Sequence, residues 1–280
     1  MDTNPEEVQD IVAGWGVHPD EGDHELRIVG VKLLVDGGFE GALLREPYAE
    51  PWGKGGTFRG VQTMPTENYH AIVKTLSTLG WRVSTHAVGD AAIDLVLDGY
   101  EAAHAEQSIV GRRWTIEHGF LPAEDQVSRI KKLGLFVSAQ HHLYVAGPSL
   151  ATYWGAERAS WTTPMRFYFD QGVPTAGGTD SPVTPYAPMN VIYHFVTRDT
   201  ISGGVFGADQ RITREEALRV MTLNNAFLTF EENVKGSIEP GKLADLVVLS
   251  DDIMTCADGN IRSVEVEMTM VGGQVVYERK

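Results

Sequence analysis

Residues 81–118 read WRVSTHAVGDAAIDLVLDGYEAAHAEQSIVGRRWTIEH and hold two strand patterns on either side of a helix pattern. The flanking stretches 81–87 and 113–118 are short and fit strands, whereas residues 90–105 repeat apolar side chains at helical spacing. In that helix we expect four residues to point inward: Ile93, Val96, Leu97 and Tyr100. A strand, a helix and a second strand in this order are typical of a parallel sheet.

The same alternation extends in both directions along the chain. Further strands are predicted at 27–36, 135–140 and 173–180, with helices after Pro65 and at 123–133. Thr66 is the expected N-cap of the helix after Pro65. The stretch 143–170 is rich in Tyr and Trp and suits a long loop with a helix. About five βα units result, and five parallel strands form an open sheet with two exposed edges.

The C-terminal part of the chain has a different character. Thr213 and Glu216 match a capping box that opens a helix running to about Phe230. A strand is predicted at 246–249, and the pair Gly272-Gly273 predicts the turn of a final hairpin. These signals indicate a small β segment that follows the α/β part.

Composition narrows the possible partners. The 280 residues include 23 Lys and Arg against 38 Asp and Glu, giving a formal charge of −15. This balance argues against a nucleic-acid or anionic-membrane partner, because no basic stripe is present to neutralise phosphates. No stretch approaches 18 consecutive apolar residues, and the N-terminus lacks the apolar region of a signal peptide. We therefore expect a cytoplasmic protein.

Polar side chains occur at or near the ends of successive predicted strands. They are Lys32, His86, His118 and Asp180. Each has a plain structural interpretation of its own: a lysine at a strand edge that reaches water, a hydrogen-bonded histidine, or an aspartate in an Asx-turn. Together they favour a site, because α/β folds assemble their sites at the carboxyl ends of strands. Two imidazoles and a carboxylate are ordinary ligands for Zn²⁺ or a similar divalent ion.

Five stretches resemble the amidohydrolase superfamily, in particular the amidohydrolase-3 group that includes N-substituted formamide deformylases. They are VKLLVDGG (31–38), THAVGDAAIDLVLDGYE (85–101), RRWTIEHG (112–119), GGTDSPV (177–183) and GSIEPGKLADLVVLSDD (236–252). The resemblance implies a partial (β/α)₈ barrel, about strands 4–8, over residues 1–235. Residues 236–280 would then be the C-terminal piece of a small β-sandwich.

The resemblance also implies roles for single residues. Lys32 resembles the strand-4 lysine that can be carboxylated to bridge two metals, and His86 and His118 resemble the next two ligands. Asp180 resembles the strand-8 aspartate that binds metal and accepts a proton from the attacking water. The family's first strand contributes an H-x-H pair, whereas this sequence contains none. Its adjacent His141 and His142 would point to opposite sides of an extended chain. We therefore expect a truncated product, a fragment or half of a split enzyme.

The predicted function is hydrolysis of an amide-like or other C–N bond in a small molecule, with one or two divalent ions, Zn²⁺ first. Four residues that follow a strand end are candidates to line the substrate pocket: Gln140, His141, Tyr144 and Trp154. One alternative is an inactive remnant that needs a partner chain, and another is a site with one metal and three protein ligands. Open sheet edges predict a homo-oligomer or a complementing chain in every case.

Overall fold

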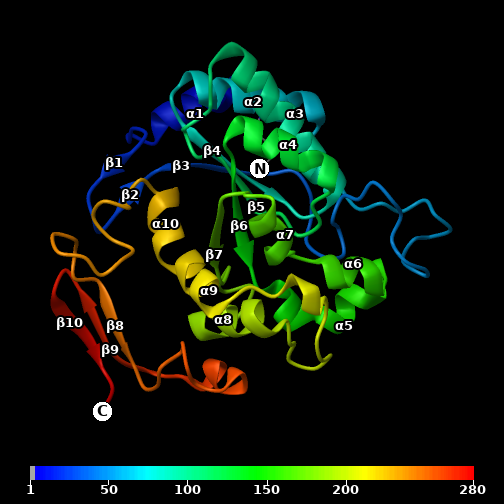
Figure 1. Cartoon of the computed structure of the whole chain (residues 1–280). Coiled ribbons are helices and arrows are strands. Elements are labelled where there is room, and N and C mark those ends of the chain that lie inside the picture. The colour runs from blue at the N-terminus through cyan, green and yellow to red at the C-terminus, as the bar shows by residue number, and fades with distance from the viewer. Residues whose placement is uncertain (1–3) are drawn as a thin grey trace.

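A computed structural model describes residues 4–280 and has a parallel sheet at its centre (Figure 1). The strand order is β3-β4-β5-β6-β7. The bounds are β3 (Gly30–Leu34), β4 (Arg82–Ala87), β5 (Thr115–His118), β6 (Phe136–Gln140) and β7 (Thr175–Gly178). Each strand pairs in parallel with the next one in the chain, so all five carboxyl ends lie at one edge of the sheet.

This sheet confirms the prediction of five parallel strands. Its two end strands are β3 and β7. Its membership of a (β/α)₈ barrel stays a prediction. The predicted strand 27–36 divides at Val29 into β2 (Arg27–Ile28) and β3, and only β3 joins the parallel sheet.

Three helices cover one face of the sheet. They are α2 (Thr66–Thr78), α3 (Asp90–Glu106) and α4 (Glu124–Leu133), and they lie together above the strands in Figure 1. Their apolar side chains form a single core with Val83, Ile116 and Val137 of the sheet. The predicted N-cap of α2 is wrong by one residue: Pro65 occupies the cap in an extended conformation, and Thr66 is the first helical residue.

The segment after β6 is more helical than predicted. It forms α5 (His142–Trp154), α6 (Ala156–Trp161) and α7 (Met165–Asp170), and β7 leads on to α8 (Pro188–Thr197). Gly155, with a φ of 85°, ends α5, and Pro164 precedes α7. Of the long loop with a helix expected in 143–170, the helix is confirmed and the long loop is wrong, because most of the Tyr and Trp side chains pack as helical residues against the rest of the molecule.

The capping box at Thr213 is confirmed. Its hydroxyl accepts a hydrogen bond from the Glu216 N–H, and the Glu216 carboxylate accepts one from the Thr213 N–H. The predicted helix to Phe230 is interrupted at Thr222, which separates α9 (Arg214–Met221) from α10 (Leu223–Leu228). Both helices contact β7 at the end of the sheet.

The remaining elements lie toward the two ends of the chain. The N-terminal part holds η1 (Pro5–Glu7), α1 (Val8–Gly14) and β1 (Glu21–Gly22), which pairs with β2. The C-terminal part follows η2 (Ala208–Gln210) and holds β8 (Leu246–Leu249), η3 (Asp258–Ser263), β9 (Val266–Val271) and β10 (Gln274–Glu278). Strands β8, β9 and β10 form a separate antiparallel sheet, and left-handed Gly272 and Gly273 make the predicted hairpin turn.

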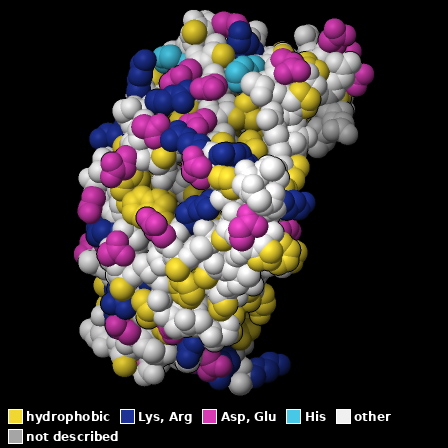
Figure 2. Space-filling view, turned by 90° about the vertical axis from the view of Figure 1, so that its right-hand side faces the viewer, with side chains coloured by type: hydrophobic (Ala, Val, Ile, Leu, Met, Phe, Trp, Pro, Cys, Tyr) yellow, Lys and Arg dark blue, Asp and Glu magenta, His cyan; other side chains and the backbone are white. Residues whose placement is uncertain are grey.

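Within residues 4–280, every helix falls short of the length and apolar character that a membrane span requires. The face shown in Figure 2 carries acidic, basic and hydrophobic side chains interspersed with one another. The net charge of −15 is therefore not gathered into one patch on this face.

Candidate metal site

The parallel sheet brings four histidine and aspartate side chains to its carboxyl edge. His86 is the last residue but one of β4, His118 ends β5, and Asp180 follows β7 by two residues. His142 is the first residue of α5, two positions after β6. Four neighbouring strands therefore each contribute one side chain to this edge.

The backbone at His118 departs from the strand conformation. Cα pairing sets His86 opposite Glu117 and Ala87 opposite His118, so regular alternation would turn His118 away from His86. His118 instead has a φ of 75°, and its ring centroid lies 4.5 Å from that of His86. Asp180 also has a positive φ, of 60°. Left-handed backbone is unfavourable for residues other than glycine and concentrates at functional sites.

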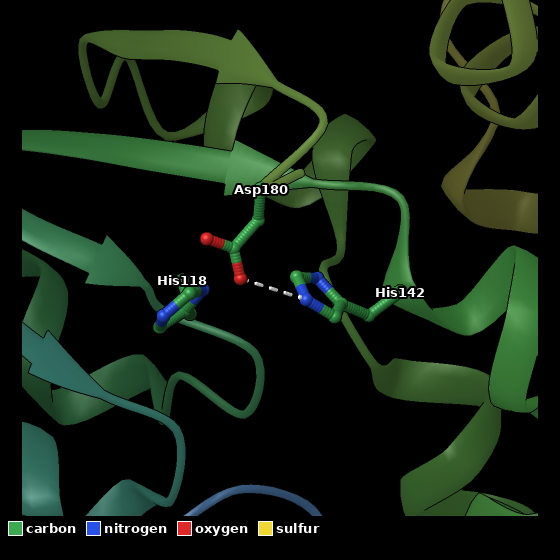
Figure 3. Close-up of side chains that lie close together, drawn as sticks. All are labelled: His118, His142 and Asp180. Carbon is green, nitrogen blue, oxygen red and sulfur yellow. Dashed lines mark hydrogen bonds and ion pairs between the residues drawn. The ribbon is translucent and has the colours of Figure 1, made fainter. Parts of the chain in front are cut away.

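His118, His142 and Asp180 form the tightest group (Figure 3). The Asp180 carboxylate points between the two imidazole rings. One potential ligand atom from each residue lies within 4.8 Å of the others, and His142 Nε2 is 3.1 Å from Asp180 Oδ2. Ligand atoms at about 2.0–2.2 Å from one zinc ion are themselves roughly 3 Å apart. A divalent ion therefore fits this group with small side-chain movements.

Hydrogen bonds fix which nitrogen of two rings carries the proton. His118 Nδ1 lies 2.7 Å from Gln140 Oε1, and His86 Nε2 lies 3.1 Å from the carbonyl oxygen of Gly37. Both oxygens can only accept, so these nitrogens are the donors. His118 Nε2 and His86 Nδ1 consequently remain available as ligand atoms, which is the usual arrangement of metal-binding histidines.

Burial sets the charge state of the site. It lowers the pKa of His118 to about 3, helped by the neighbouring His86 and His142, and it lowers the pKa of His86 as well. The hydrogen bond from His142 lowers the pKa of Asp180. At neutral pH the site therefore presents neutral His118 and His86 beside an ionised carboxylate, the protonation states that a divalent cation requires.

A pocket of about 360 Å³ opens beside these side chains. Its lining combines the potential ligands with an apolar wall and two charged groups: Lys32, Gly38, Phe39, Glu40, His86, Val88, His118, Phe120, His142, Asp180 and Val183. The Phe39 ring stacks on Phe120, with centroids 5.9 Å apart. The pocket is large enough for a small organic molecule next to the candidate ligands.

Lys32 lines this pocket and is exposed, so it fits the interpretation of a lysine at a strand edge that reaches water. This exposure has a topological cause. β3 is an end strand of the sheet, and its face with Lys32 and Leu34 is not covered by the helices that bury the other face. The Lys32 ammonium therefore reaches water without a burial penalty.

The four residues predicted to line a substrate pocket are buried and lie outside the lining just described. Gln140 accepts the hydrogen bond from His118, and Trp154 donates to the Phe39 carbonyl oxygen. The His141 ring stacks near Tyr144, with centroids 5.7 Å apart, and its pKa falls to about 4 because of burial. A substrate-binding role for the four stays a prediction.

Sequence reasoning missed His142. The expectation of an extended chain at 141–142 is wrong, because His142 starts α5. The His142 side chain enters the site, while that of His141 is buried in the core. A signal was present: His142 lies two residues past the end of a predicted strand, and the four predicted candidates also lie at or near strand ends.

Comparison with known proteins identifies the family of this chain. The model of the amidohydrolase family matches residues 1–277. N-substituted formamide deformylase from Arthrobacter pascens is 34% identical over 232 residues, which are 80% of this chain and 41% of that protein.

Two solved structures are also similar to this chain. An uncharacterized metal-dependent hydrolase from Pyrococcus furiosus has a TM-score of 0.72 and 33% identity, over 90% of this chain and 50% of that one. One from Pyrococcus horikoshii has a TM-score of 0.76 and 28% identity, over 92% of this chain and 51% of that one. The chain thus spans about half the length of these relatives.

A parallel sheet with histidines and an aspartate at its carboxyl edge defines the class of α/β proteins that can assemble a metal site there. With the match over residues 1–277, the chain belongs to the amidohydrolase family. The similarity to N-substituted formamide deformylase supports the amidohydrolase-3 group, as the sequence motifs predicted.

Proposed function

We propose that this chain carries the metal site of a hydrolase that cleaves amide-like or other C–N bonds in small molecules. The observation that carries the proposal is the group of His118, His142 and Asp180 beside the pocket. His118 and His142 would hold a divalent ion, Zn²⁺ first, together with Asp180. His86 and Lys32, which line the same pocket, are the candidates for a second ion, with Lys32 acting as a ligand only when its amine is carboxylated. A bound ion of this kind lowers the pKa of water and polarises a carbonyl group.

The protein's own residues supply the proton transfer. Asp180 is ionised and half-buried, so it accepts the proton of the attacking water and delivers it to the leaving nitrogen. Phe39, Phe120 and Val183 give the substrate an apolar surface in the pocket. An uncharged substrate with a small apolar group suits this lining.

The first experiment measures Zn²⁺ binding by isothermal titration calorimetry on protein stripped of metal. We expect about one equivalent or more for the wild type and at least a tenfold weaker affinity for a His118→Ala/His142→Ala double variant. His24→Ala is the matched control, because His24 is exposed and lies outside the pocket lining. A wild type that binds no Zn²⁺ overturns the proposal and favours a chain that needs a partner.

Activity is then assayed on N-substituted formamides and simple amides. Asp180→Asn removes the proton acceptor, and we expect turnover to fall about 10²-fold or more. Unchanged turnover with retained metal would contradict the role of Asp180.

We further propose that residues 1–235 are part of a larger (β/α)₈ barrel and that residues 236–280 belong to a small β-sandwich. The end strand β3 supports association with a second copy or a complementing chain, because an end strand offers unpaired backbone groups. At the other end, the side chains of Asn224 and Asn225 hydrogen-bond the backbone of β7. Sedimentation at several concentrations tests this, and a monomer throughout would count against it.

A further inference from the structure

Asp36 is a fully buried carboxylate that the proposed reaction does not use. It lies just beyond β3, in the motif VKLLVDGG. Leu34 pairs with His86 across the two parallel strands, so the chain that continues from β3 passes beside the His86 ring. Sheet register alone therefore brings Asp36 next to a candidate ligand.

The groups that face the Asp36 carboxylate are all N–H donors. Oδ2 accepts from the backbone N–H groups of Leu43 and Gly89, both at 3.0 Å, and Oδ1 accepts from that of Val88 at 3.1 Å. His86 Nε2 lies 3.4 Å from Oδ1. Burial raises the pKa of this carboxyl to about 7, whereas the three backbone donors favour its ionised form.

These hydrogen bonds join three segments around one wall of the pocket: the end of β3, the chain at Leu43 and the loop between β4 and α3. The segments that meet at Asp36 are closely packed. A Cβ on Gly89 would lie 1.9 Å from the Leu43 carbonyl oxygen. The carboxylate is thus held rigidly, and so is the direction in which Oδ1 faces His86.

We propose that Asp36 is a positioning residue that keeps the proton of His86 on Nε2 and so presents Nδ1 to the metal. The proposal rests on the proposed metal site. The Gly37 carbonyl oxygen and Asp36 Oδ1 both face Nε2 and are both acceptors. A protonated Nε2 satisfies them, while a protonated Nδ1 would leave lone pairs facing lone pairs. Outer partners of this kind orient metal-binding histidines.

The test uses Asp36→Asn, which keeps the size of the side chain. The asparagine oxygen can replace Oδ2 toward Leu43 and Gly89, and its NH₂ group then faces His86. We expect the affinity for the second Zn²⁺, the ion assigned to His86, to fall about 10–100-fold, as for other outer partners of metal ligands. Asp94→Asn is the matched control, because that carboxylate pairs with Arg45 and Gln126 instead. Its affinity should equal that of the wild type.

Two measurements separate positioning from general damage. In a His86→Ala background, Asp36→Asn should have no further effect on Zn²⁺ affinity, whereas an equal loss in both backgrounds overturns the proposal. Long-range ¹H–¹⁵N NMR on the metal-free wild type should show His86 protonated on Nε2. A dominant Nδ1-protonated ring overturns the proposal even if the variant fails to fold. Because this spectrum needs no metal, it also distinguishes failure here from absence of Zn²⁺ binding.

Discussion

His118 and Asp180 adopt left-handed backbone conformations that cost about 1–3 kcal/mol each for residues other than glycine. Both residues enter the candidate metal site, and the His118 side chain would not point there from a regular strand. Packing by the surrounding sheet and helices offsets this cost. The strained backbone thus lies at two residues whose side chains are proposed to bind the metal.

His142 should control the protonation of Asp180. Its hydrogen bond is the main cause that lowers the Asp180 pKa. In His142→Ala we therefore expect this pKa to rise toward its ordinary value of 3.8. ¹³C NMR titration of the carboxyl group in metal-free protein measures the change. His24→Ala should leave the value as in the wild type, and an unshifted value in His142→Ala would contradict the hydrogen bond.

At the scale of elements, the helices that follow β6 and β7 decide which polar groups enter the site and which enter the core. α5 turns His142 toward the pocket, and α8 buries His194 completely. His194 lies beside Arg198, whose guanidinium donates to four backbone carbonyl oxygens. This helical region therefore holds an imidazole that must be neutral in the folded protein.

The stability of the protein should consequently depend on pH through α8. Burial holds the pKa of His194 well below 6.5 in the folded state, so the unfolded chain binds more protons between the two values. The stabilisation is fully present above about pH 6.5 and is lost as the pH falls. One such histidine contributes a decrease of about 2 kcal/mol from pH 7 to pH 5.

Urea unfolding at the two pH values measures this decrease. His194→Gln should reduce it by that amount, since glutamine does not titrate, whereas His24→Ala should leave it unchanged. An identical decrease in wild type and His194→Gln would refute the assignment.

At the scale of the whole molecule, the C-terminal segment is packed against the α/β part through its non-strand residues. Ile253, Ile261 and Val264 belong to the same core cluster as residues of α8 and α9. Arg214 of α9 also donates to the carbonyl oxygens of Ile253 and Cys256. These residues near the antiparallel sheet thus share a hydrophobic core with the α/β part.

This shared core predicts a large effect for one substitution. Ile261→Ala removes a fully buried side chain, and we expect the free energy of unfolding to fall by about 2–5 kcal/mol. Ile238→Ala is the control in the same segment, because Ile238 is 86% exposed, and its effect should stay within about 0.5 kcal/mol. Denaturant unfolding followed by fluorescence provides both values. Equal effects would show that the η3 contact contributes nothing to stability.

The sequence by itself determined the parallel strands, the main helices, the capping box at Thr213 and the hairpin at Gly272-Gly273. These features follow from local signals: apolar periodicity, turn residues and caps. Local signals also place His86, His118 and Asp180 at strand ends, because the carboxyl ends of parallel strands must share an edge.

Only the tertiary structure decided which side chains meet. His142 joins the site because α5 begins at that residue, and Lys32 is exposed because β3 lies at the end of the sheet. Asp36 reaches His86 through the register of β3 against β4. The start of α5, the position of a strand in the sheet and the strand register all depend on contacts between distant segments, and periodicity within a single segment carries no information about those contacts.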